Sequence, residues 1–205
     1  GPGGMGEGAS LSKVKDKKNT YSIEHAWASD YDQDSCNTYK RNIKPKAVFC
    51  EKVENFFSLV DKKKIILPKF DCFAYGFPCN DFSNVGEHLG IKGKFGPLYS
   101  YGVELIDRYH PNWFIAENVG GIRSSNEGKT FLKILKDLEN AGKGYNLTVH
   151  KYKFEEYGIP QARHRIIIVG IKKELNLKFK VPKPNYKTMT AKEALSNIPA
   201  NAHNN

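Results

Sequence analysis

Residues 70–83 read Phe-Asp-Cys-Phe-Ala-Tyr-Gly-Phe-Pro-Cys-Asn-Asp-Phe-Ser, and this stretch decides the fold prediction. Its first half is aromatic and apolar and predicts a strand that Gly76 ends. Phe77 and Pro78 then carry Cys79 onto a loop at the carboxyl end of that strand, where open α/β sheets bind their ligands. A cysteine in this position is a candidate nucleophile, although a free cysteine is more often a buried structural residue.

The composition is that of a globular protein with an anionic partner. The 205 residues are 40% hydrophobic and carry a net charge of +10, which favours nucleic acid first and an anionic membrane second. A lysine-rich proteome would give the same charge. There is no apolar run of membrane-spanning length and no visible signal peptide, so we expect a cytoplasmic protein. The four cysteines lack the paired spacing of a zinc site, and we expect no metal.

The first fifty residues suggest a nucleotide-binding edge. The run Gly1-Pro-Gly-Gly precedes a helical segment, and glycine backbone there can approach a ligand closely. Residues 12–20 are charged and without periodicity, so we expect a solvated insertion. A strand predicted over residues 23–29 ends at Asp30, which could bind ribose hydroxyls. Alternatively, Asp30 or Asp32 caps the helix that follows.

Further elements are predicted in this order: a helix over 33–42, a strand over 47–50, a helix over 98–110, a strand over 113–116 that ends at Glu117, a helix over 131–138, and strands over 145–154 and 166–170. The alternation of strands and helices predicts a parallel α/β sheet. Cys79 and Glu117 would then be neighbours at its carboxyl edge. Arg163 and Arg165 lie two residues apart before the last strand and are expected to point to the same side.

Three ordered motifs resemble the catalytic domain of the DNA (cytosine-5)-methyltransferases. They are Gly-Phe-Pro-Cys-Asn-Asp-Phe-Ser (76–83), Glu-Asn-Val (117–119) and Tyr-Gly-Ile-Pro-Gln-Ala-Arg-His-Arg (157–165), with weaker matches at residues 1–4 and 30–31. The resemblance implies a Rossmann-like S-adenosylmethionine-dependent methyltransferase sheet with helices on both faces. Asn80 stands where the family usually has Gln, and Asp30 where Glu is commoner; both differences are tolerable.

The resemblance also implies roles for the motif residues. Cys79 would add to carbon 6 of cytosine as a thiolate. Glu117 would be protonated and hydrogen-bonded to ring nitrogen 3, so we predict a raised pKa in a desolvated pocket. Arg163 and Arg165 would lower the thiol pKa and orient the base or its phosphate. The basic, glycine-rich loop over residues 84–96 would close over a flipped cytosine.

The implied cofactor is S-adenosyl-L-methionine. Asp71 would contact the adenine amine, Asp30 the ribose hydroxyls, and Tyr31 the face of the adenine ring; for Asp71 the alternative is a turn residue at the start of the strand. The full set of expected cofactor-binding residues is Gly1, Gly3, Gly4, Asp30, Tyr31, Asp71, Pro78 and Leu98.

The domain prediction divides the chain into residues 1–171, a partial catalytic domain, and residues 172–205, a basic tail leading to an absent target-recognition domain. Nothing precedes Gly1, so the first strand of such a sheet is expected to be missing. We therefore expect a fragment, or one half of a split enzyme whose second polypeptide carries target recognition. We expect either to be inactive alone.

Three functions remain in competition. The first is methylation of double-stranded DNA, in a restriction-modification setting. The second is methylation of cytosine in RNA by the related type of enzyme, and the third is a non-catalytic regulatory homologue. Such homologues typically lose the Cys or the Glu, whereas this chain keeps Cys79 and Glu117.

Overall fold

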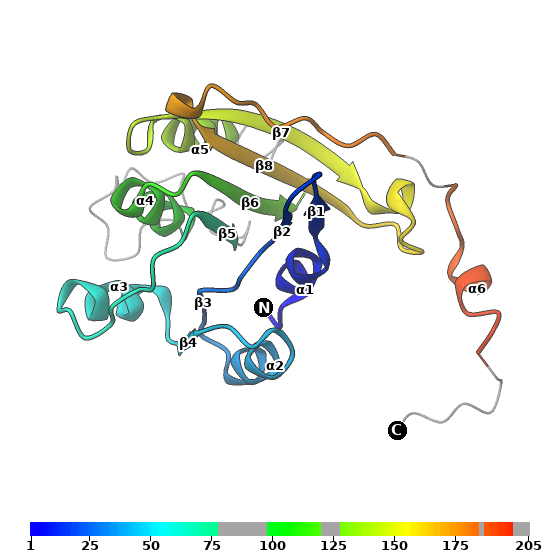
Figure 1. Ribbon diagram of the computed structural model, residues 1–205, viewed down its shortest axis with the longest axis horizontal. Coiled ribbons are helices and arrows are strands. Elements are labelled where there is room, and N and C mark those ends of the chain that lie inside the picture. The colour runs from blue at the N-terminus through cyan, green and yellow to red at the C-terminus, as the bar shows by residue number, and fades with distance from the viewer. Residues whose placement is uncertain (78–97, 120–127, 185–186, 199–205) are drawn as a thin grey trace. The chain divides into compact units, whose positions relative to one another are not determined.

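The computed structural model describes residues 1–77, 98–119, 128–184 and 187–198 (Figure 1). The chain forms two compact units, Gly1–Phe70 and Asp71–Asn205. Pro78, Cys79 and the predicted loop over 84–96 lie outside the described residues. Among the described helices, none is long and apolar enough to cross a membrane.

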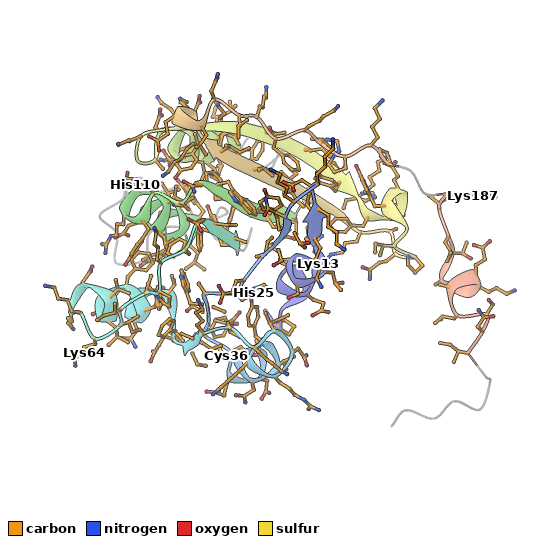
Figure 2. All side chains as sticks on the ribbon, viewed as in Figure 1. Lys13, His25, Cys36, Lys64, His110 and Lys187 are labelled. Carbon is orange, nitrogen blue, oxygen red and sulfur yellow. The ribbon has the colours of Figure 1, made fainter. Side chains whose placement is uncertain are left out.

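The first unit is built on two parallel strands. Its elements are α1 (Gly4–Leu11), β1 (Lys13–Lys15), β2 (Thr20–Ser22), β3 (Trp27–Asp30), α2 (Gln33–Ile43), β4 (Ala47–Cys50) and α3 (Val53–Asp61). β3 pairs with β4 so that Asp30 lies opposite Cys50, and both strands end at the same edge. Aromatic rings fill the space beneath them, with Phe56 stacked 5.7 Å from Trp27. Cys36, on the inner side of α2, is also buried (Figure 2).

Two predictions for this unit are resolved by the structure. Asp32, not Asp30, caps α2, because its carboxylate accepts a hydrogen bond from Ser35 N at 2.7 Å. Residues 12–20 are exposed as expected, but they are not irregular: β1 and β2 form an antiparallel hairpin. Asp16 fixes its turn by accepting hydrogen bonds from the backbone of Lys18 and Asn19, both at 2.7 Å.

The second unit contains a four-stranded mixed sheet. Its elements are β5 (Cys72–Gly76), α4 (Tyr99–Tyr109), β6 (Trp113–Val119), α5 (Lys129–Asn140), β7 (Tyr145–Lys153), the 3-10 helix η4 (Phe154–Tyr157), β8 (His164–Lys172), the 3-10 helix η5 (Lys173–Leu175) and α6 (Ala191–Ala194). The strand order is β5-β6-β8-β7 (Figure 1).

The prediction of a parallel sheet is therefore wrong for half of this unit. β5 and β6 are parallel, but β8 runs antiparallel to both β6 and β7. Only residues 154–163 connect β7 to β8, and a parallel crossover needs about a dozen residues or more. The short connection allows only the antiparallel arrangement.

One face of the sheet carries the core. Along β6 the buried residues alternate, with Phe114, Ala116 and Asn118 on one side. Ile106 of α4 and Ile134 of α5 belong to the same buried cluster as Phe114 and Ala116. Because strand side chains alternate between faces, α4 and α5 share this face. Helices on both faces were expected, and α4 and α5 account for one of them.

We predict that Gly102→Ala destabilises the second unit. Gly102 of α4 lies against the buried ring of Tyr75, and a Cβ at this position would overlap ring atoms. Overpacking costs about 1–3 kcal/mol, which exceeds the gain of roughly 1 kcal/mol that alanine gives a helix interior. Urea unfolding followed by circular dichroism measures the difference.

The matched control is Gly8→Ala in α1, where a Cβ meets nothing within 4 Å. This change should leave the protein as stable as the wild type or more so. An unfolding free energy for Gly102→Ala equal to that of Gly8→Ala would contradict the packing argument.

Candidate active site

The carboxyl ends of β5 and β6 are locked side by side. Gly76 lies opposite Glu117 in the parallel register, and Phe77 N donates to Glu117 O at 3.4 Å. The buried side chain of Asn118 donates to Phe77 O at 2.9 Å. Cys79 follows two residues after Phe77. The last described residue before the predicted nucleophile is thus held beside Glu117.

Glu117 pairs with an arginine from the antiparallel neighbour. Arg165 Nε lies 2.7 Å from Glu117 Oε1, and the two side chains are 19% and 25% exposed. Arg165 Nη1 also donates to His164 O at 2.8 Å, which fixes the guanidinium at two points. The sequence analysis linked Arg165 to the thiol and missed this pair, because a parallel sheet gave no reason to place β8 next to β6.

The two carboxylate oxygens of Glu117 have different surroundings. Oε1 is bound by Arg165, whereas Oε2 faces the end of β5. A Cβ at Gly76 would lie 3.2 Å from Oε2, so glycine there leaves room beside this oxygen. The arrangement leaves Oε2 directed toward Gly76 at the end of β5.

Arg163 does not share the position of Arg165. β8 begins at His164, so the strand alternation used to align the two arginines does not extend to Arg163. Its carbonyl accepts a hydrogen bond from Phe154 N at 3.0 Å, and the residue is exposed. The strand assumed for this expectation does not include Arg163, so a common direction of the two side chains stays a prediction.

His164, between the arginines, is held by a residue that the sequence analysis did not consider. Its Nε2 lies 2.7 Å from Glu155 Oε1 in η4. A hydrogen bond from its own backbone amide and the contact with His164 lower the pKa of Glu155. This contact ties η4 to the start of β8, and so restrains the segment that presents Arg165.

The expected cofactor residues of the first unit gather at one strand edge. Asp30 ends β3, its carboxylate accepts a hydrogen bond from Asp32 N at 3.0 Å, and it pairs with the amino group of Gly1. Tyr31 follows and is 74% exposed. Gly3, at φ 114°, precedes α1, which begins at Gly4. The Asp30 carboxylate suits the two hydroxyls of a ribose, and the exposed ring of Tyr31 suits a flat heterocycle. The glycine residues before α1 leave room for a polar substituent of the same ligand.

Glu51 is a further carboxylate at this edge that the sequence analysis missed. It follows β4 directly, and its backbone N donates to Asp30 O at 2.9 Å. Its position after a short strand was the available signal.

Asp71 and Leu98 lie at different ends of β5. The carbonyl of Asp71 accepts a hydrogen bond from Asn112 N at 2.7 Å just before β5 and β6 begin, so Asp71 sits at the amino end of the strand, opposite to Gly76. Leu98 begins α4, and the ring of the next residue, Tyr99, is 6.2 Å from Phe77. The structure brings Leu98 to the carboxyl end and leaves Asp71 at the other.

Two of the three described cysteines, Cys36 and Cys72, are poor nucleophiles. Cys36, Cys50 and Cys72 are free thiols. Burial raises the pKa of Cys72 to about 12 and that of Cys36 to about 11, so both are protonated near neutral pH. In the described ranges there is also no group of three or more His, Cys, Asp or Glu side chains that could hold a metal ion.

We predict that Glu155→Gln removes part of the acid sensitivity of the fold. Because the folded pKa of Glu155 lies below 4.5, its ionisation stabilises the protein above that pH, and this contribution is lost as the pH falls through the folded pKa. The variant should be less stable at pH 6 and should lose less stability on acidification, as measured by urea unfolding at several pH values. Glu139→Gln, in an exposed pair with Lys173, is the control. Identical pH profiles for wild type and Glu155→Gln would contradict the assignment.

Comparison with known proteins identifies the family of this chain. The family model for C-5 cytosine-specific DNA methylase matches residues 1–205. Type II methyltransferase M.BbvI of Brevibacillus brevis is 51% identical over all of this chain and 56% of its own length. M.NgoFVII of Neisseria gonorrhoeae, also a type II methyltransferase, is 33% identical over 89% of this chain and 49% of its own. The chain spans about half the length of the curated relatives it matches.

Solved structures support the fold alone. A candidate DNA modification methyltransferase encoded within an E. coli prophage superposes with a TM-score of 0.63 at 24% identity, covering 85% of this chain and 48% of that one. Spodoptera frugiperda DNMT2 superposes with a TM-score of 0.54 at 20% identity, covering 77% of this chain and 45% of that one. Because the family model matches this chain from residue 1 to residue 205, the chain belongs to the C-5 cytosine-specific DNA methylase family.

Proposed function

We propose that the protein transfers a methyl group from S-adenosylmethionine to carbon 5 of cytosine in double-stranded DNA, as part of a restriction-modification system. The observation that carries the proposal is the register that puts Gly76 opposite Glu117, with the Pro78-Cys79 loop leaving β5 at that point. The similarity to M.BbvI and M.NgoFVII, both type II methyltransferases, supports the restriction-modification setting. Target recognition would fall to the part of these relatives that this chain does not match, or to a second polypeptide.

In the proposed reaction Cys79 acts as the nucleophile. Its thiolate forms a bond to carbon 6 of cytosine, and the ring electrons shift toward carbon 5 and nitrogen 3. Bound S-adenosylmethionine would supply the methyl group to carbon 5 as its sulfur–methyl bond breaks, leaving S-adenosylhomocysteine. Water then removes the proton from carbon 5, the carbon–sulfur bond breaks, and the thiolate returns.

Glu117 would assist by holding a proton at nitrogen 3. Arg165 binds Oε1 of this carboxyl group, so Oε2 is the oxygen left to carry the proton and face the base. Two fixed contacts on the guanidinium would keep the carboxyl group in one orientation throughout. Arg163, outside the strand, is assigned to the base's phosphate rather than to Glu117.

The cofactor assignment follows the edge of β3. Asp30 would accept from the ribose hydroxyls, Tyr31 would stack on the adenine ring, and the segment from Gly1 through Gly3 to Gly4 would hold the methionine part. Pro78 and Leu98 would border the methyl-transfer point. We leave Asp71 out of this set because it lies at the amino end of β5.

We expect Cys79→Ser in the full-length protein to abolish methyl transfer, and Glu117→Gln to lower kcat by roughly 10²- to 10⁴-fold, the usual contribution of general acid catalysis. The assay measures transfer of labelled methyl groups to duplex DNA and identifies the modified base. Glu104→Gln, exposed on α4, is the control and should keep full activity. A methyl group found on another base, or transfer at the wild-type rate by Cys79→Ser, would overturn the proposal.

We expect Asp30→Ala to weaken S-adenosylmethionine binding by about tenfold or more, because a hydrogen bond to a charged group is worth about 1.5–3 kcal/mol. Asp71→Ala should leave the affinity unchanged. Isothermal titration calorimetry in the absence of DNA compares the two variants. The reverse ranking would restore Asp71 as the cofactor carboxylate and exclude the assignment made here.

A further inference from the structure

We propose that a groove between β7, η4 and residues 181–184 binds the sugar-phosphate backbone of the substrate DNA. This inference rests on the proposed function and adds a binding surface to it. The groove has a volume of about 310 Å³, and its lining residues are His150, Lys151, Lys153, Glu156, Tyr157, Val181, Pro182, Lys183 and Pro184.

One wall of the groove is the chain that follows β8, and hydrogen bonds hold it against β7 (Figure 1). Asn146 Nδ2 donates to Leu177 O at 3.2 Å, and Thr148 Oγ1 donates to Phe179 O at 3.1 Å. Tyr157 OH then donates to Pro182 O at 3.0 Å, where the groove lies. The basic tail expected to lead away from the catalytic domain is therefore fastened along β7 as far as Pro182.

The charge of the groove suits a polyanion. Three lysines line it against a single carboxylate, and Lys153 is paired with that Glu156 at 3.4 Å. Lys151 and Lys183 form no ion pair within the described residues, and both are exposed. Their ammonium groups are available to phosphate oxygens, which attract lysine as a point charge.

The uncharged part of the lining suits the sugars between the phosphates. The ring centroids of Tyr157 and Tyr152 are 5.3 Å apart. Tyr157, Pro182 and Pro184 form the apolar part of the groove lining. Basic groups beside aromatic and apolar surface are typical of grooves that follow a nucleic-acid backbone.

The groove lies at the catalytic end of the sheet. In the ladder between β7 and β8, Lys153 lies opposite His164 and Tyr152 lies opposite Arg165. Arg165 in turn contacts Glu117 on β6, the other neighbour of β8. Neighbouring strands are about 4.8 Å apart, so the backbone of β7 runs roughly 10 Å from that of β6. Phosphates of one duplex strand advance about 3.4 Å along the helix axis, so roughly three steps span a distance of about 10 Å.

The test measures how the DNA affinity of the full-length protein depends on salt. The variant is Lys151→Gln with Lys183→Gln. The control is Lys136→Gln with Lys143→Gln, which removes the same charge from exposed positions on α5 and just before β7 begins, at the other end of the sheet. Removing one lysine that binds a phosphate should lower the slope of log affinity against log salt by about 1.

We expect the slope of the groove variant to fall by about 2, in proportion to the two lysines replaced. Binding should weaken equally for duplexes with and without the target sequence, and the control should keep the wild-type slope. A wild-type slope in the groove variant would overturn the inference, as would an equal fall in the control. If the wild type itself fails to bind duplex DNA, the proposed function fails instead.

A second measurement changes the DNA instead of the protein and begins with the wild type. Neutral methylphosphonate linkages placed one at a time within three steps of the target cytosine should weaken wild-type binding at one or two positions. The DNA affinity of the groove variant should not change when those phosphates are neutralised. Equal weakening of both proteins at every position would exclude binding of a phosphate in the groove.

Discussion

The site depends on the two hydrogen-bonded ladders of β6. On one edge the parallel pairing with β5 puts Gly76 opposite Glu117, and on the other the antiparallel pairing with β8 brings Arg165 to the same carboxylate. Because side chains alternate along a strand, a shift of β6 by one residue would turn Glu117 to the face on which Asn118 is buried. Backbone pairing thus fixes both which residue faces the loop and which oxygen of its carboxyl group is free.

Buried polar contacts secure this register. Asn118 is 2% exposed, yet its amide is satisfied, because Nδ2 donates to Phe77 O at 2.9 Å and Oδ1 accepts from Val119 N at 2.7 Å. Leaving such a group unpaired costs about 1–3 kcal/mol, so a displaced loop start would be penalised. The core beneath, where Tyr75 packs on Gly102, holds α4 and the end of β5 together. Packing and polar satisfaction therefore support the same placement of the residues that precede Cys79.

Local patterns predicted the elements well and their long-range pairing less well. The strand over 47–50 was predicted with its correct bounds, and Asp32 was one of two predicted caps. The parallel pairing that puts Glu117 opposite Gly76 could be predicted, because a helix separates these two strands along the chain. The direction of β8 depends on the short connection after β7, which periodicity does not encode, so the Glu117–Arg165 pair was missed. The hairpin at residues 13–22 has no buried face, so its sequence carries no alternating apolar pattern from which the two strands could be predicted.

The most direct test of the central claim is covalent trapping. The full-length protein is incubated with S-adenosylmethionine and a duplex that contains 5-fluorocytosine, and the products are separated on a denaturing gel. Fluorine cannot leave carbon 5 as a proton does, so a nucleophile bonded to carbon 6 remains attached. We predict a stable protein–DNA adduct that disappears in Cys79→Ser. An adduct that persists in Cys79→Ser, or none from a protein that methylates cytosine at carbon 5, would contradict the account.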